Sequence, residues 1–146
     1  MKPSVHNIII AVLIAIIVGA YFFAPSSRSS SKSTVPAIDP NTPPIIVKME
    51  PPNGAIGVDP SVSEIRVTFD RPMAGGFSWC GGGDHYPKIT EGQKPYWKPD
   101  QKTCVLPIRL RPNWDYKLGI NCPSAQNFRS ANGIAAPVTW YEFSTK

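Results

Sequence analysis

The stretch at residues 43–73 constrains the fold of this chain most, because two runs of alternating residues lie there on either side of turn-forming residues. An alternation of period two predicts half-buried β-strands. The side chains that we expect to face the core are Ile45, Val47 and Met49 in the first run and Ile65, Val67 and Phe69 in the second. Prolines, glycines and asparagine at residues 51–60 predict turns and leave no room for a helix. The stretch therefore predicts an all-β domain, either a sandwich or a barrel.

Composition agrees with a compact β domain and excludes two other classes. The chain of 146 residues has 17 prolines and 11 glycines, too many for a helical bundle, while its 42% hydrophobic content is too high for a disordered chain. Residues 43–146 carry 12 basic and 9 acidic side chains, with no basic cluster. Binding to nucleic acid needs clustered positive charge, so we expect no nucleic-acid partner.

The amino terminus resembles an export signal, and two interpretations stay open. Lys2 precedes an apolar run of 17 residues, 8–24, which we expect to enter a membrane. As an uncleaved signal anchor at residues 1–24, it would hold the chain in the membrane by a single pass, and the aromatic residues Tyr21, Phe22 and Phe23 favour this. As a signal peptide it would be cleaved after Ala20, and the protein would be secreted.

Residues 25–42 are rich in serine, threonine and proline, with hardly any apolar side chain. Such a segment cannot form a core, so we expect a flexible linker. A flexible chain of this length spans on the order of 20 to 25 Å. The sequence therefore predicts three parts, the anchor or signal at 1–24, the linker at 25–42 and the folded domain at 43–146.

Three segments of the domain resemble one known family. Residues 52–60 (PNGAIGVDP) with 65–73 (IRVTFDRPM), then 111–120 (RPNWDYKLGI), then 132–133 (NG) with 140–145 (WYEFST) are similar to the bacterial Ig-like domains of the SbsA type. The resemblance implies an Ig-like β-sandwich of about seven strands, an extracytoplasmic carboxyl end and no catalytic residues. Residues 75–100 depart from the family's pattern.

The later strands of the domain carry specific expectations. In a strand at 103–110 the inward residues would be Cys104, Leu106, Ile108 and Leu110, and Pro107 predicts an edge strand or an unpaired position. Tyr116 begins the next strand, where Ig-like folds place a structural tyrosine at the corner between sheets. The last strand, at 137–144, has apolar residues of both parities, so we expect it to be buried on both sides.

Three cysteines in an exported chain leave one unpaired if the other two join. Cys104 and Cys122 share the parity of the inward residues and are equally far from the turn at 111–115, so the spacing permits a disulfide between them, with Cys80 as the odd one. The alternative is that these cysteines are buried and free. A zinc site from these cysteines and His85 lacks any compact ligand spacing, so we expect no metal and no cofactor.

The segment 79–87 is the most unusual in composition, with three successive glycines before Asp84, His85 and Tyr86. Asp84, Tyr86 and Trp97 are the candidate ligand-binding residues, as a platform for a sugar ring; the alternative is that these aromatic rings cover one end of the core. Asp84 and His85 could form an acid/base or metal pair, but no nucleophile accompanies them, so we expect no enzyme.

We expect a non-catalytic module at the cell envelope with a structural or adhesion role and an unknown protein or polysaccharide partner. The alternative is a carbohydrate-binding module.

Overall fold

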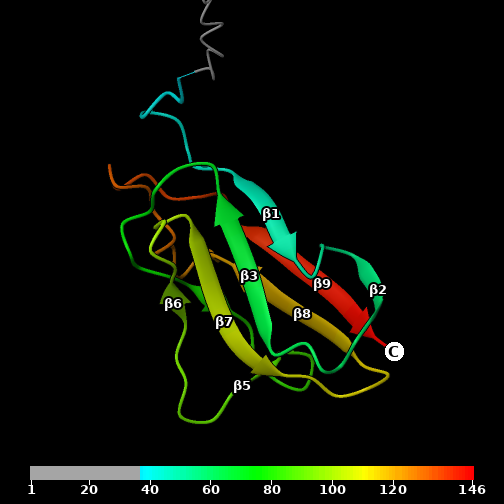
Figure 1. Cartoon of the computed structure of the whole chain (residues 1–146). Coiled ribbons are helices and arrows are strands. Elements are labelled where there is room, and N and C mark those ends of the chain that lie inside the picture. The colour runs from blue at the N-terminus through cyan, green and yellow to red at the C-terminus, as the bar shows by residue number, and fades with distance from the viewer. Residues whose placement is uncertain (1–36) are drawn as a thin grey trace, which may run out of the picture. The chain divides into compact units, whose positions relative to one another are not determined.

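The computed structural model describes residues 37–146, and within this range it is all-β, with no helix (Figure 1). The predictions for residues 1–24, and for the linker up to residue 36, lie outside the described residues. No helix in the described part is long and apolar enough to cross a membrane. The strands are β1 (Ile46–Glu50), β2 (Ala55–Val58), β3 (Glu64–Phe69), β4 (Trp79–Cys80), β5 (Lys88–Ile89), β6 (Tyr96–Trp97), β7 (Thr103–Arg109), β8 (Asp115–Ile120) and β9 (Thr139–Thr145).

The first sheet has the order β1-β3-β7-β5, and β6 also pairs with β7. The alternation predicted for β3 is confirmed, because Ile65, Val67 and Phe69 are all buried. The alternation predicted for the first run is wrong. A bulge between Ile46 and Lys48 shifts the register. It leaves Ile45 and Val47 exposed to 57% and 56%, and Ile46 packs against the core in their place. Met49 packs against the core as predicted.

β7 is an interior strand, so of the two alternatives predicted from Pro107 the edge strand is wrong and the unpaired position is confirmed. β3 pairs with one side of β7, and β5 and β6 pair with the other. Ile108 N donates to Ser63 O at 2.8 Å, so in the alternating antiparallel ladder Pro107 faces away from β3. On its other side Thr90 N donates to Pro107 O at 3.1 Å, between the short strands β5 and β6. Pro107, which has no amide hydrogen, therefore lies opposite the gap between β5 and β6.

The second sheet has the order β2-β9-β8-β4. β2 runs parallel to β9, although the sequence predicted only turns at residues 51–60. The Asn53 side chain helps to hold it there, because its amide donates to Trp140 O at 3.0 Å and its oxygen accepts from Glu142 N at 2.9 Å. The prediction that the last strand is buried on both sides is wrong. Tyr141 and Phe143 are buried, whereas Trp140 and Glu142 face solvent.

The core lies between the two sheets. Phe69 and Phe128 pack with ring centroids 5.4 Å apart, and Trp79 meets Phe128 edge-on at the same centroid distance. Residues 37–146 form one compact unit by their own contacts. The fully buried residues at its centre are Ile65, Val67, Cys104, Leu106, Leu118, Ile120, Phe128 and Tyr141. The unit therefore contains both sheets and this core.

The connection from β7 to β8 crosses from the first sheet to the second. Tyr116 is buried at this corner, and Arg111 N donates to its hydroxyl at 2.7 Å. Its ring stacks on Phe143, with centroids 5.2 Å apart. The structural role predicted for Tyr116 is confirmed.

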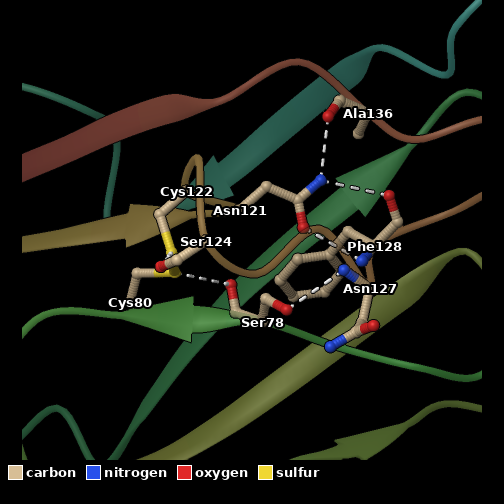
Figure 2. Close-up of a disulfide and its surroundings, with 8 residues drawn as sticks. All are labelled: Ser78, Cys80, Asn121, Cys122, Ser124, Asn127, Phe128 and Ala136. Carbon is tan, nitrogen blue, oxygen red and sulfur yellow. Dashed lines mark hydrogen bonds between the residues drawn. A yellow bond between two sulfur atoms is a disulfide. The ribbon is translucent and has the colours of Figure 1, made fainter.

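The disulfide joins Cys80 to Cys122, with Cα atoms 6.2 Å apart, so the prediction of a Cys104–Cys122 bridge is wrong (Figure 2). Cys80 lies in β4, beside β8, and Cys122 follows β8 by two residues. Cys104 lies in β7, in the other sheet, and is a free buried thiol. Equal distance from the turn at 111–115 is therefore no guide to pairing, because that turn changes sheets instead of closing a hairpin.

Asn121 holds the chain that follows the disulfide. Its side-chain amide donates to Phe128 O at 3.2 Å and to Ala136 O at 2.8 Å, and its oxygen accepts from Phe128 N at 3.0 Å (Figure 2). The residue is fully buried, and these bonds satisfy its polar atoms. Phe128 is thereby held in the core.

Candidate functional site

The glycine-rich segment 79–87 is hydrogen-bonded to the corner between the sheets and to β8. Asp84 O accepts from Arg111 Nη2 and from Trp114 Nε1, each at 3.0 Å. Lys117 N donates to His85 O at 2.9 Å. These backbone contacts tie the loop to the β7–β8 corner and to β8, so the loop's carbonyl oxygens serve the fold.

The His85 side chain also contacts this corner. Its Nδ1 donates to Asp115 O at 2.8 Å, and its ring stacks on Trp114 with a centroid distance of 5.5 Å. The Arg111 guanidinium lies 3.7 Å from the centroid of the same indole ring. Within residues 37–146 no group of three or more histidine, cysteine, aspartate or glutamate side chains is placed to hold a metal ion.

Tyr86 and Trp97 pack against the core. Of the three candidate residues, Asp84 and Tyr86 line one small hollow of about 120 Å³, and Trp97 is not part of its wall. A Cβ on Gly81 would lie 2.6 Å from Tyr86 Cδ2, so the tyrosine ring covers that glycine. Burial also raises the pKa of Tyr86. The Trp97 ring lies 6.1 Å from Phe69 and 5.9 Å from Phe128 between centroids. The geometry matches the alternative stated for these aromatic residues, that they cover the core.

A different surface presents exposed apolar side chains, and we call it the outer face. It is the solvent side of β2, β9 and β8, where Ile56 is 90% exposed and Trp140 is 52% exposed. A hollow of about 510 Å³ opens on it, with Ile56, His85, Asp115, Lys117 and Glu142 in its wall. Contiguous exposed apolar surface marks interaction sites. We take the outer face as the candidate because it presents an exposed isoleucine at the hollow and an exposed indole on the neighbouring strand.

Cross-strand pairing explains how Trp140 is held on the outer face. Gly119 is paired with Trp140 on one side and with Cys80 on the other, so the three residues form one row across the sheet. A Cβ on Gly119 would lie 3.4 Å from the Trp140 ring and 3.2 Å from Cys80 Cβ. The indole ring therefore rests over a position that has no side chain, beside the disulfide.

An ion pair lies next to Trp140 on the same face. Lys117 Nζ is 2.7 Å from Glu142 Oε1 and 5.5 Å from the centroid of the Trp140 ring. Both side chains of the pair are more than half exposed. The outer face thus combines an exposed indole and an exposed isoleucine with charges of both signs.

The sequence prediction missed Ile56 and Trp140. Trp140 has the opposite parity to Tyr141 and Phe143, and that parity could have placed it outside if the last strand had been taken as buried on one side. Ile56 lies in a segment predicted as turn, and no pattern at residues 51–60 indicates a strand.

No protein-family model matches this sequence, and no curated protein sequence matches it.

Proposed function

We propose that this chain is a non-catalytic Ig-like module displayed at the cell envelope, with a structural or adhesion role exercised through protein contacts. The strand orders β1-β3-β7-β5 and β2-β9-β8-β4 support the Ig-like assignment. They correspond to the A-B-E-D and A′-G-F-C orders of that fold, with β5 and β6 sharing the place of strand D. The hydrogen-bonded Tyr116 at the corner between sheets supports it further.

The outer face is the single observation that carries the interaction role. Indole rings are enriched where proteins bind one another, because a tryptophan side chain removes a large apolar area from water on contact. The Lys117–Glu142 pair would supply polar contacts at the rim of such an interface.

Display at the envelope rests on residues 8–24 and can be tested on the full chain. We expect single-pass anchoring through residues 8–24 with the domain outside the cytoplasm, or secretion if the chain is cut after Ala20. The measurement is fractionation of cells that express a carboxyl-terminally tagged chain, followed by protease treatment of spheroplasts. We expect to recover the tag in the membrane fraction or, if the chain is cleaved, in the medium. A membrane-bound tag is expected to be lost when the spheroplasts are treated with protease. A tag found intact in the cytosol contradicts display.

The interaction role can be tested by site-specific crosslinking in the intact envelope. A photo-crosslinking amino acid at position 56 or 140 is expected to give discrete adducts with another protein, because both positions lie on the outer face. The matched control is position 45, an isoleucine that is also exposed but directly precedes β1 of the first sheet. Adducts of equal yield at position 45, or none at 56 and 140, contradict a specific role for this face.

The second candidate function is binding to an envelope polysaccharide, which the half-exposed Trp140 ring favours because an open indole can stack on a sugar. The domain 37–146 is expected to sediment with insoluble envelope polysaccharide and to lose retention in Trp140→Ala. Trp97→Ala does not serve as the test, because that ring packs on Phe69 and Phe128. Equal retention of the domain and Trp140→Ala contradicts sugar binding at this ring.

A further inference from the structure

A second hollow, away from the outer face, lies at the open edge of the sandwich between β4 of the second sheet and the short strands of the first. Its volume is about 430 Å³, which falls within the range of ligand-binding clefts. Fully buried Leu106 forms part of its wall, so the hollow reaches the core. Its other apolar walls are Phe77, Trp79, Tyr86, Ile89, Pro95 and Ala125.

The wall of this edge pocket contains no charged residue. Its polar members are Ser78, Cys80, which is in the disulfide, and Asn127. The hollow on the outer face differs, because Asp115, Lys117 and Glu142 line it. The free-energy cost of moving an unpaired charge into an apolar site is far larger than the free energy gained by burying apolar surface. The edge pocket therefore selects an uncharged apolar group.

The backbone beside the pocket has an unpaired strand edge. Within the described residues β4 is the end strand of the second sheet. Asn121 N donates to Ser78 O at 3.0 Å, and Trp79 is paired with Ile120. Since hydrogen-bonded and non-hydrogen-bonded pairs alternate along an antiparallel ladder, the amide and carbonyl of Trp79 point away from β8, toward the free edge.

We propose that the edge of β4 binds an extended segment of a partner protein as an added strand, with one uncharged apolar side chain of that segment inserted into the edge pocket. An added strand gains affinity from main-chain hydrogen bonds and specificity from a pocket for alternate side chains. Residues 77–80 line the pocket, and within them β4 presents the outward amide and carbonyl of Trp79. The site shares no lining residue with the hollow on the outer face, so each can fail without the other.

The test is a titration of the isotopically labelled domain 37–146, which carries its own core, with a short blocked peptide. In this probe threonines alternate with apolar residues around a central phenylalanine. Two matched peptides carry aspartate at the centre, or N-methyl groups on the backbone amides that would pair. The apolar peptide is expected to give saturable shifts of the amides at 77–81, and each matched peptide to bind at least about tenfold more weakly, a difference of about 1.4 kcal/mol.

Two variants test the pocket from the protein side. Ala125→Phe fills it and Ile89→Asp places a charge at its exposed rim, so each is expected to weaken binding at least about tenfold. Ala131→Phe is the matched control, because Ala131 is exposed and lies outside this pocket. The proposal is overturned if the apolar peptide gives no saturable shift at millimolar concentration. It is also overturned if the N-methylated peptide binds equally well, or if Ala125→Phe and Ile89→Asp, both retaining the folded spectrum, bind as the unmodified domain does.

Discussion

At the scale of single residues, the unusual glycine-rich segment is explained by packing. Gly81 has a φ of +140° and lies under the Tyr86 ring, whereas a Cβ on Gly82 would meet nothing within 4 Å. The same run of glycines therefore contains a position where a side chain has no room and one where it has ample room.

We expect Gly81→Ala to destabilise the domain by about 1 to 3 kcal/mol, because the new methyl group would clash with Tyr86 and the backbone conformation is strained for alanine. The measurement is the free energy of unfolding in urea. Gly82→Ala is the control, with an expected change within about 0.5 kcal/mol. Equal stability of the two variants would contradict the packing described for Tyr86.

A second residue-scale prediction concerns the buried hydroxyl at the corner between sheets. Tyr116→Phe removes the acceptor of the Arg111 amide and is expected to cost about 1 to 2 kcal/mol, since that donor is left without its partner. Tyr96→Phe is the matched control. Tyr96 is exposed and its hydroxyl donates to Glu64 at 3.2 Å, so a change below about 0.5 kcal/mol is expected. Urea denaturation of both variants measures the difference.

At the scale of elements, the disulfide stabilises the shortest strand of the second sheet. β4 has two residues and pairs only with β8 among the described strands. The Cys80–Cys122 bridge closes 42 residues of chain and ties β4 to the end of β8. Such a cross-link restricts the unfolded chain, and it also holds a strand whose own ladder is short.

We expect the Cys80→Ser/Cys122→Ser double variant to lose about 2 to 4 kcal/mol of stability. Cys104 is buried, and burial raises the pKa of its thiol to about 12, so it is expected to resist thiol reagents in the native domain. Thiol titration should therefore find none reactive when folded and one when unfolded, and peptide mapping should recover the 80–122 link. A 104–122 link would contradict the structure.

At the scale of the whole molecule, four carboxylates distributed over the domain share one property. The pKa of Asp59 is lowered to about 2, chiefly by hydrogen bonds from Ser61. Hydrogen bonds from Arg66, Arg71 and Thr103 likewise lower the pKa values of Glu64, Asp70 and Asp100. A carboxylate whose folded pKa is depressed contributes stability above its unfolded pKa, and this contribution is lost as the pH falls through the folded pKa.

We therefore expect the domain to keep its stability from neutral pH down to about pH 5 and to lose it progressively between about pH 4 and pH 2. The measurement is the urea midpoint at pH 7 and at pH 3. Asp100→Asn, which removes one of these titrating groups, is expected to have a smaller difference between the two midpoints. Equal midpoints at both pH values in the unmodified domain would contradict the role of the four carboxylates.

The sequence by itself determined the all-β class, the buried parity of β3 and the structural role of Tyr116. The first two follow from local chemistry, because prolines and glycines exclude helices and alternation assigns the faces of a regular strand. The role of Tyr116 was expected from the resemblance, since Ig-like folds place a structural tyrosine at this strand start.

Only the tertiary structure decided which strands are neighbours. Parity states which residues of one strand share a face, but it carries no information on which strand lies beside another. Cys104 and Cys122 had the same parity, but Cys104 lies in the first sheet and Cys122 follows β8 of the second, while Cys80 lies beside β8. The bulge that turned Val47 outward and the pairing that exposed Trp140 are likewise products of neighbouring strands. The candidate surfaces depend on those neighbours, so the sequence could not predict them.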